Sequence, residues 1–486
     1  MTQAVNHVAL LPLYAAAGTA LLVLIADLAF ARFQVLAGVL GGIATAVCAL
    51  AVPGRPDTFC TGDLCSWVTP RAALTAVIFA ALTIGVLALS APALRLGLAP
   101  RGEFCFLLAC SMAGGVVVAY AGDLITLIVG LETLTLPLYV LVGLRRIRVT
   151  TAGASAAVTF FLVSVVSTAV ALLGAALLYA ATGALHLTAL VTGSDPLPAV
   201  GAAMIVVGFA FKVAAVPLHA WAPATYDGSP VPVAAYLSTA SKLGGVLALA
   251  AVVERLDTGP LVAVLAVLTM TVGNLVALRQ TRMVRLLAWS SVAQAGYIIA
   301  PLAAGAIGVE AALAYAIFFV VLEFLAFGVI TALRTPGTDG GDLDDYRGAG
   351  RRNKWLGAAL VLALAGLAGL PPGLAGLFAK VAVVESLIAA GWGWLAGVVA
   401  INAVIALAYY LRVAALLYAV REPVGRPLAA PAGAGPVAVL DPELLQAATH
   451  PRVAVARPVA TAIAVAAVVA VVLGFAPQVV FDFLNG

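Results

Sequence analysis

Apolar segments follow one another along nearly the whole chain, with short polar stretches between them. A helix of about 20 apolar residues crosses the hydrocarbon core of a bilayer, which is about 30 Å thick. The pattern therefore predicts an all-α polytopic membrane protein with fourteen transmembrane helices. The predicted spans are 7–29, 33–53, 72–94, 102–121, 123–144, 155–181, 199–220, 231–253, 260–278, 286–306, 310–333, 355–390, 393–419 and 458–480.

Two of these spans contain proline at a position that interrupts a helix. The segment 355–390 is too long for one straight helix and contains Pro371 and Pro372, while 199–220 contains Pro217. Proline removes a backbone hydrogen bond and clashes with the preceding turn. We therefore expect spans 7 and 12 to be broken helices, a feature that often marks ion sites in transporters.

The composition describes a chain that lies almost entirely within the bilayer. Hydrophobic residues make up 64% of the 486 positions and charged residues 9%, against about 45–50% and about 25% in soluble domains. These values exclude a soluble enzyme, a disordered chain and a nucleic-acid binder. We interpret 1–486 as one membrane domain, in which the Pro-, Ala- and Gly-rich segment 420–457 is a flexible cytoplasmic linker to the last helix at 458–480.

The basic residues predict the orientation, because cytoplasmic loops of membrane proteins carry an excess of Lys and Arg. If the N-terminus is outside, 18 of the 25 basic residues fall in inside loops, and the outside loops hold only Arg55, Arg71 and Arg255. Both termini are therefore expected outside, which also requires an even number of spans.

Three of the four lysines, Lys212, Lys242 and Lys380, fall inside apolar spans. A lysine at the centre of a span costs about 2.5–3.5 kcal/mol on insertion scales. The alternative to a functional role is that each side chain extends to the membrane interface. That alternative is weakest for Lys212 and Lys242, which lie midway along their spans, so we take all three as candidate proton carriers.

Glu132 lies near the centre of span 5, within GLETLTLPLYVL. A lone carboxylate in hydrocarbon must be protonated or paired. A pair with a buried lysine lets both groups carry charge, and separating the partners favours their neutral forms, so the lysine releases a proton. We infer that Glu132 and Lys212 form such a switch, although the sequence alone does not set their distance.

His219 and Glu323 are lesser candidates for proton transfer. His219 follows Pro217 at the expected inside end of span 7, where it is either a proton relay or an interfacial residue. Glu323 lies near the middle of span 11, a depth at which function is the default reading and a helix contact is the alternative. Glu385 lies five residues after Lys380, which places the two on different helix faces.

Cys60 and Cys65 lie in the predicted outside loop 54–70. An oxidising compartment would let them pair, and two free thiols are the alternative. The chain has no close cysteine cluster and no Gly-rich phosphate motif. We therefore expect this chain itself to bind no cofactor and no metal.

Several stretches resemble the antiporter-like membrane subunits of complex I, the proton-pumping NADH–quinone oxidoreductase. They are GLETLTLPLYVL (130–141), FKVAAVPLHAWAPATYDGSPVPVAAYLSTASK (211–242), GNLVALRQTRMVRLLAWSSVAQAGYI (273–298), DLDDYRG (342–348) and GLPPGLAGLFAKVAVVES (369–386). These motifs lie between residues 120 and 420, and the flanking spans agree only in number and hydropathy.

The resemblance implies a fold and a set of roles. It implies N-terminal helices 1–3 at 1–94 and two inverted repeats of five helices, at 102–253 and 260–419. It also implies that Glu132 and Lys212 are the paired residues of spans 5 and 7, that Lys242 is the central connecting lysine, and that Lys380 is the lysine of broken span 12. Neighbouring members often have glutamate at this last position, so lysine points to one branch of the family.

Two positions depart from the family pattern. Thr159 stands where a lysine is common near the start of span 6, and Gln294 stands where a histidine is common in span 10. We therefore expect fewer titratable groups than usual along the centre of the membrane, with Glu323 as an additional acid.

The activity implied by the resemblance is outward proton translocation through a Glu/Lys relay, driven by quinone reduction in partner subunits. NADH, FMN, iron–sulfur clusters and quinone are expected in those partners, which include further antiporter-like subunits of the membrane arm. The expected location is a bacterial plasma membrane. Two alternatives stay open: a subunit of a multi-subunit cation/proton antiporter, and a proton-inert structural subunit of the same membrane arm.

Overall fold

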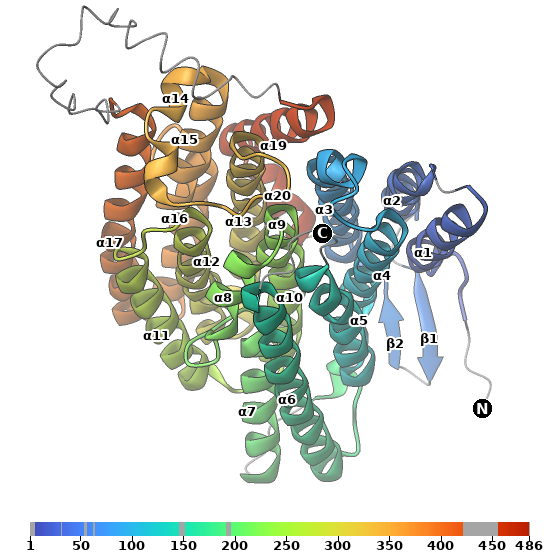
Figure 1. Cartoon of the computed structure of the whole chain (residues 1–486). Coiled ribbons are helices and arrows are strands. Elements are labelled where there is room, and N and C mark those ends of the chain that lie inside the picture. The colour runs from blue at the N-terminus through green and yellow to red at the C-terminus, as the bar shows by residue number, and fades with distance from the viewer. Residues whose placement is uncertain are drawn as a thin grey trace, which may run out of the picture.

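The computed structural model describes residues 5–30, 32–52, 56–61, 64–144, 151–190, 196–420 and 455–485. Within these ranges the chain forms a bundle of helices with a two-stranded antiparallel hairpin at one side (Figure 1). The N-terminal part, blue in Figure 1, consists of α1 (Leu11–Ala29), α2 (Gln34–Ala51), β1 (Asp57–Thr61), β2 (Leu64–Trp67) and α3 (Pro70–Arg95).

The first predicted repeat contains the helices that surround the break in span 7. They are α4 (Arg101–Tyr120), α5 (Leu124–Gly143), α6 (Thr151–Thr182), the 3-10 turn η1 (Leu187–Ala189), α7 (Pro196–Lys212), α8 (Trp221–Gly228), α9 (Val231–Tyr236), the π-helical turn η2 (Leu237–Ser241) and α10 (Lys242–Val253). Helices α6 and α7 pack against each other along their length.

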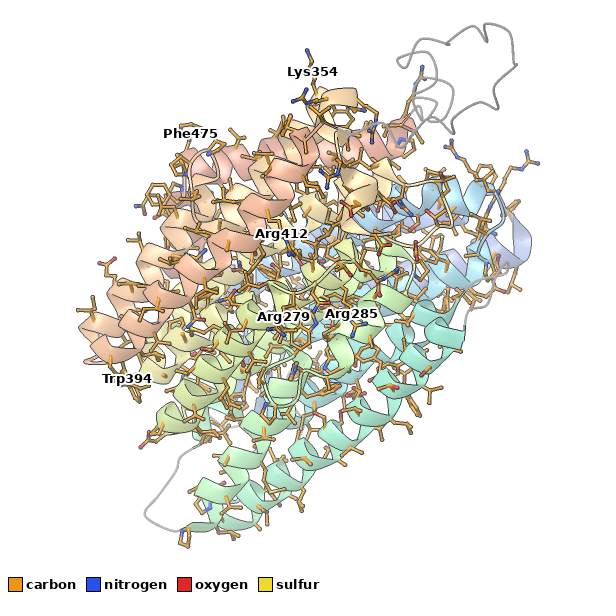
Figure 2. The ribbon with its side chains drawn as sticks, turned by 60° about the vertical axis from the view of Figure 1, so that its left-hand side comes forward. Arg279, Arg285, Lys354, Trp394, Arg412 and Phe475 are labelled. Carbon is orange, nitrogen blue, oxygen red and sulfur yellow. A yellow bond between two sulfur atoms is a disulfide. The ribbon has the colours of Figure 1, made fainter. Side chains whose placement is uncertain are left out.

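The second predicted repeat holds the break in span 12. Its elements are α11 (Gly259–Ala277), α12 (Met283–Ile299), η3 (Ala300–Ala304), α13 (Ala306–Leu333), η4 (Leu343–Tyr346), α14 (Ala349–Arg352), α15 (Lys354–Ala368), α16 (Leu374–Ala389) and α17 (Gly393–Tyr418). Figure 2 shows Lys354, where α15 begins, far from Trp394, at the start of α17.

The C-terminal helices connect the two sides of the bundle. Helix α19 (Arg457–Phe475) packs against α3, α13 and α16, and α20 (Gln478–Asn485) packs against α3 and α13. The predicted linker 420–457 falls mostly in 421–454, which lies outside the described residues.

Twelve helical stretches of the described chain are long and apolar enough to cross a membrane. Predicted spans 7 and 12 are not among them, because α7 ends at Lys212 and α15 ends at Ala368. The prediction of an all-α polytopic membrane fold with two broken helices is confirmed. The count of fourteen spans and the inverted-repeat relation stay predictions.

The breaks follow from local chemistry. After α7, residues 213–220 leave the helix ahead of Pro217, because the residue before a proline is disfavoured in helical geometry. After α15, Gly369 takes the left-handed conformation (φ 82°), and its N–H bonds back to the carbonyls of Ala365 and Gly366. This is the usual glycine termination of a helix, and Pro371 and Pro372 follow it.

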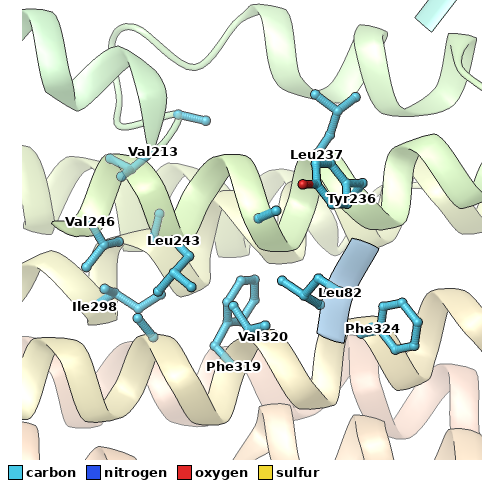
Figure 3. Close-up of a cluster of buried hydrophobic side chains, with 14 of the residues drawn as sticks. Leu82, Val213, Tyr236, Leu237, Leu243, Val246, Ile298, Phe319, Val320 and Phe324 are labelled. Carbon is cyan, nitrogen blue, oxygen red and sulfur yellow. The ribbon is translucent and has the colours of Figure 1, made fainter. Parts of the chain in front are cut away.

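The core centres on α10, α12 and α13. Figure 3 shows Leu243 and Val246 of α10 close to Ile298 of α12 and Phe319 of α13. Large apolar side chains are instead exposed on α1, α2, α6 and α17. Those helices therefore offer apolar surface to lipid or to neighbouring subunits, whereas most residues of α10, α12 and α13 are buried.

The structure corrects several element boundaries and adds elements. Helix α1 begins at Leu11 rather than at residue 7, and the last predicted span is divided into α19 and α20. The hairpin β1–β2 was not predicted, and it lies within the predicted outside loop 54–70. His219 does not lie at the end of a helix but inside the break between α7 and α8, because regular helix stops at Lys212.

Candidate functional site

Lys212 is the last residue of α7, and the break that follows leaves its side chain in the interior. Its Nζ atom donates to Glu132 Oε1 at 2.6 Å, to Ser164 Oγ at 2.8 Å and to Thr135 Oγ1 at 3.3 Å. An ammonium group has three N–H donors, so every donor of Lys212 has an acceptor. The predicted pairing of Glu132 with Lys212 is therefore present.

Glu132, on α5, holds its carboxylate among hydroxyl groups. Its Oε1 atom also accepts a hydrogen bond from the Thr168 hydroxyl of α6, and the Tyr139 hydroxyl lies 3.4 Å from Oε2. The Glu132 side chain is 25% exposed and the Lys212 side chain 3%. The pair is therefore asymmetric, with a sealed cation and a carboxylate that reaches the surface of the chain.

Helix α10 passes directly against Lys212. A Cβ atom at Gly245 would lie 2.9 Å from Lys212 Cβ, so only glycine lets the two backbones come this close. No hydrogen bond of the described chain joins Lys212 to Lys242.

Lys242 begins α10 immediately after the π-helical turn η2. Its Nζ atom donates to the carbonyl oxygen of Ser291 at 2.5 Å and to Ser291 Oγ at 2.6 Å, and it lies 5.4 Å from the centre of the Phe319 ring. π-Helical turns are rare and occur frequently at functional sites. Lys242 thus sits at the centre of the bundle, on a neutral partner.

Glu323 lies on α13 and has no exposed surface. Neither of its carboxylate oxygens has a hydrogen-bond partner among the described residues. Buried polar groups are normally hydrogen-bonded, so a carboxylate without a partner is unusual in this interior.

Lys380 lies on α16, one turn and a half after the break in span 12, and has no carboxylate in contact within the described chain. Its Nζ atom donates to the carbonyl oxygen of Leu367 at 2.7 Å. The centres of the Tyr297 and Tyr315 rings lie 5.4 and 6.0 Å from Nζ, within the range of cation–π attraction. The carbonyl is free because α15 ends one residue later and leaves its last C=O groups without helical partners.

Gln294 connects Lys380 to the core of the second half. Its amide nitrogen donates to the same Leu367 carbonyl at 2.9 Å and to the Tyr410 hydroxyl at 3.0 Å, and its amide oxygen accepts from the Tyr315 hydroxyl at 2.7 Å. Tyr410 in turn contacts Ser290 Oγ at 2.5 Å. The sequence marked Gln294 as a departure from the histidine that is common in the family, and it gave no sign of these partners. Its partner tyrosines had no sequence signal beyond a hydroxyl at membrane depth.

His219 does not join the lysine sites. It is half-buried, its ring centre lies 5.1 Å from that of Trp289, and its Nδ1 atom has no partner among the described residues. Thr159 is the other departure from the family pattern, and its side chain makes no recorded hydrogen bond in the Lys212 site. The hydroxyls that accept hydrogen bonds from Lys212 belong to Thr135 and Ser164.

A cluster of ion pairs links loops and helix ends at one face of the bundle. Arg282 donates from Nε to both carboxylate oxygens of Asp227, at 2.8 and 3.1 Å, and from Nη2 to Asp339 at 2.9 Å. The bond to Asp227 raises the pKa of Arg282, and Arg282 lowers the pKa of Asp339. Arg334 joins Asp345 of the DLDDYRG motif at 2.8 Å, so this motif folds the loop rather than forming a proton site.

Arg412 points toward the end of α11, where it donates to the carbonyls of Leu278 and Gln280, each at 2.8 Å (Figure 2). A basic side chain there satisfies carbonyls that the helix end leaves open. Cys60 and Cys65, whose pairing the sequence left open, form a disulfide across the hairpin. Their sulfurs are therefore not thiolate ligands for a metal.

Comparisons with known proteins agree with the architecture. The sequence pattern of the family described as NADH:quinone oxidoreductase/Mrp antiporter, TM, matches residues 121–406. The chain is similar to NADH-quinone oxidoreductase subunit N of Salinispora tropica, at 58% identity over 99% of each chain. It is also similar to NADH-quinone oxidoreductase subunit N 2 of Streptomyces griseus, at 41% identity over 100% of this chain and 94% of that one.

Solved structures show the same fold. A chain of respiratory complex I from Thermus thermophilus aligns with a TM-score of 0.79 and 28% identity, over 97% of this chain and 98% of that chain. A chain of the Mrp complex from Dietzia sp. aligns with a TM-score of 0.78 over 98% and 95%, and at 21% identity it supports the fold alone. The lysine at position 380 favoured the branch called subunit N, and the relatives carry that name. The chain belongs to the NADH:quinone oxidoreductase/Mrp antiporter family, within its subunit N branch.

Proposed function

We propose that this chain is a proton-translocating membrane-arm subunit of an NADH–quinone oxidoreductase. The observation that carries the proposal is the contact between Lys212 and Glu132 at a helix break inside an apolar span. A buried ion pair contributes little net stability in exchange for its desolvation. The chain has only four lysines, and one of them forms this buried pair at a cost in desolvation free energy, which favours a functional role for the pair.

The proposed route is a relay of separated sites. Protons enter from the inside, reach the Glu132–Lys212 pair, pass to Lys242 and leave outward near Lys380. His219 is the weakest member, because it lies apart in the break after α7. Within this proposal the segments 102–253 and 260–419 are the two inverted repeats, and each contributes one lysine beside a break.

The energy of the pair is sufficient for the task. Moving one proton outward works against about 2.3 kcal/mol per 100 mV. Breaking a buried ion pair by removing one partner costs about 3–5 kcal/mol. A conformational change that pulls Glu132 from Lys212 can therefore drive a proton off the lysine against the membrane potential.

The driving force must come from other subunits. We propose that NADH, FMN, iron–sulfur clusters and quinone are handled by partners, and that this chain sits beside further antiporter-like subunits in a bacterial plasma membrane with both termini outside. The buried acids and lysines of the described chain supply proton-binding groups, and its apolar exposed helices supply surface for neighbours. The chain is thus part of an enzyme complex without holding its redox centres.

The test is Lys212→Ala in the intact complex, assayed in inverted membrane vesicles. We expect NADH-driven vesicle acidification to be lost while the complex still assembles, as judged by co-purification of its flavin and iron–sulfur subunits. Lys354→Ala is the matched control, because Lys354 lies at the start of α15 rather than inside the bundle. Acidification at the parental rate in an assembled Lys212→Ala complex would contradict the proposal.

A cation/proton antiporter subunit is the second candidate, favoured by the fold shared with the Mrp complex of Dietzia sp.. Purification from native membranes in mild detergent separates the two. Recovery with only small hydrophobic subunits, and sodium-dependent proton exchange without quinone reduction, would move the function to ion exchange.

A further inference from the structure

Four buried side chains from four helices meet at the centre of the bundle. They are Lys242 of α10, Ser291 of α12, Glu323 of α13 and Tyr226 of α8, and each is at most 2% exposed. We call this group the Ser291 node. Among the described residues it shares no hydrogen bond with the Glu132–Lys212 pair or with Lys380.

One face of α13 places Glu323 between Lys242 and Tyr226. Phe319, Glu323 and Phe327 are four residues apart in turn, so they share a helix face. The ring of Phe319 lies 5.4 Å from Lys242 Nζ, and the ring of Phe327 lies 6.4 Å from the ring of Tyr226. The Glu323 carboxylate is therefore bracketed by the lysine on one side and the tyrosine on the other.

The hydrogen-bonding groups of the node are incompletely used. Ser291 Oγ accepts from Lys242 at 2.6 Å, which leaves the single hydroxyl hydrogen of Ser291 to donate. Glu323 Oε1, Glu323 Oε2 and the Tyr226 hydroxyl have no partner among the described residues. Helix α13 packs against both α10 and α12, and α8 packs against α12, so the four side chains come from helices that contact one another. The node thus has one acid, one base and two hydroxyls facing one another.

We propose that Lys242 and Glu323 share one proton through the hydroxyl of Ser291, which makes the node a second acid–lysine pair. In one state the node holds an ammonium and a carboxylate. In the other it holds an amine and a carboxylic acid. Ser291 receives the proton from Lys242 Nζ as it gives its own hydrogen to Glu323, so one N–H and one O–H bond break and two O–H bonds form.

The transfer leaves the total charge of the node unchanged, which matters because an isolated buried charge is costly. The neutral state needs no counter-ion and leaves Lys242 able to accept the next proton. In this proposal Tyr226 is a positioning residue: its hydroxyl, which has no partner among the described residues, donates to Glu323 when that group becomes a carboxylate. The node rests on the proposed function, and it assigns to Glu323 a task that the lysine sites do not perform.

The experiment compares variants of the intact complex in inverted vesicles, scoring protons moved per quinone reduced. Glu323→Gln cannot take up the proton, and we expect the ratio to fall about tenfold or more, as for loss of a positioned acid–base group. Ser291→Ala removes the bridge and should approach the same loss. Tyr226→Phe removes one hydrogen bond and should lower the ratio about two- to fivefold.

The chain offers matched controls. Ser238→Ala removes a buried hydroxyl one turn before Lys242 that bonds only to its own helix, at Ala235. Glu385→Gln removes an exposed acid of α16. Both controls should pump at the parental ratio.

A spectroscopic measurement separates proton sharing from a packing role. The redox-induced infrared difference spectrum of the complex should contain a carboxylic-acid band that is absent in Glu323→Gln, shifted in Glu323→Asp and diminished in Ser291→Ala. If Glu323→Gln fails to assemble, the Asp variant and the Ser291→Ala band decide the question. Parental pumping by assembled Glu323→Gln, or a band unchanged by Ser291→Ala, would overturn the proposal.

Failure of the node can be told from failure of the proposed function. If Lys212→Ala and Lys242→Met abolish pumping and Glu323→Gln does not, the relay stands and the node is rejected. If none of the three affects pumping, both are rejected.

Discussion

The two lysines beside helix breaks have opposite surroundings. Lys212 holds a carboxylate and two hydroxyls, and its acid partner reaches the surface of the chain. Lys380 holds one backbone carbonyl between two tyrosine rings. A nearby carboxylate favours the charged form of a lysine, whereas a neutral carbonyl supplies no opposite charge. Within the proposed relay we therefore expect Lys212 to hold its proton more firmly than Lys380.

The largest effect should come from separating the partners of the first site. Lys212→Ala leaves the Glu132 carboxylate without its cation, at a cost of about 3–5 kcal/mol. Lys380→Ala leaves only the Leu367 carbonyl partly unsatisfied, at a cost of about 1–3 kcal/mol. The dissociation temperature of the purified complex should therefore fall further for Lys212→Ala. Adding Glu132→Gln to Lys212→Ala should recover stability without recovering pumping. Equal dissociation temperatures for Lys212→Ala and Lys380→Ala would show that the two lysines do not differ in their surroundings as proposed.

The second site depends instead on close approach of two half-helices. A Cβ atom at Gly376 of α16 would lie 1.7 Å from the backbone oxygen of Gly366 of α15. Gly376→Ala must push the segments apart, at about 3 kcal/mol, the upper end of overpacking costs. We expect assembled complex on native gels to be strongly depleted. Gly397→Ala, on α17 with nothing within 4 Å, is the control and should be normal.

Gln294 should matter more for the Lys380 site than a single neutral side chain suggests. Gln294→Leu has a similar size but leaves the hydroxyls of Tyr315 and Tyr410 without their amide partner. The expected cost is about 1–3 kcal/mol, with a slower proton release that is measured as reduced pumping at unchanged quinone reduction. Gln294→His should keep more activity than Gln294→Leu, because an imidazole can still bond to these hydroxyls. Identical pumping in both variants would show that the amide is not part of the route.

The smallest effects should come from the ion pairs at the helix ends. Asp227→Asn replaces the carboxylate that accepts two bonds from Arg282 by an amide with only one acceptor oxygen. Asp339 is 48% exposed, so Asp339→Asn should cost less, below about 0.5 kcal/mol. Because Arg282 lowers the pKa of Asp339 below its ordinary 3.8, the stability from this pair is present above that value. It is lost as the pH falls through the lowered pKa, since the folded protein must then take up a proton. Melting temperatures of the two variants from pH 7 down to pH 3 test the order and the sign.

The membrane fold could be predicted from the sequence because hydrocarbon penalises every polar group. The approximate span positions and the pairing of Glu132 with Lys212 follow from that penalty. Both breaks follow instead from the prolines at 217, 371 and 372. The partners of Lys242 and Lys380 could not be predicted, since a serine of α12 and a carbonyl of α15 become partners only through the angles at which the helices pack. The hairpin was not predicted either, because it lies in a short loop with weak alternation. The disulfide across it was one of two alternatives that the sequence left open.

Gln294 shows why absence of a familiar residue is a poor guide. Because glutamine replaces a histidine, Gln294 was expected to mean one proton carrier fewer. Its side chain nevertheless bonds to the Leu367 carbonyl and to the hydroxyls of Tyr315 and Tyr410 around Lys380. An amide has both donors and an acceptor, so it can order hydroxyls that a titrating group would use. Glu323 is the opposite case. The sequence singled it out only by its depth in span 11, and the structure places it fully buried among the residues of the Ser291 node.

The partial exposure of Glu132 has a consequence for biogenesis. Its neighbours along the outer face of α5, Val129 and Leu136, are more than half exposed and apolar. A newly inserted chain therefore presents a carboxylate at the border of a surface made for lipid or for another subunit. Until a neighbour covers that border, the carboxylate lies beside hydrocarbon, where an incompletely solvated charge is costly. We therefore expect the chain to reach its stable folded state only when it joins its complex. Unassembled copies should be degraded by membrane proteases.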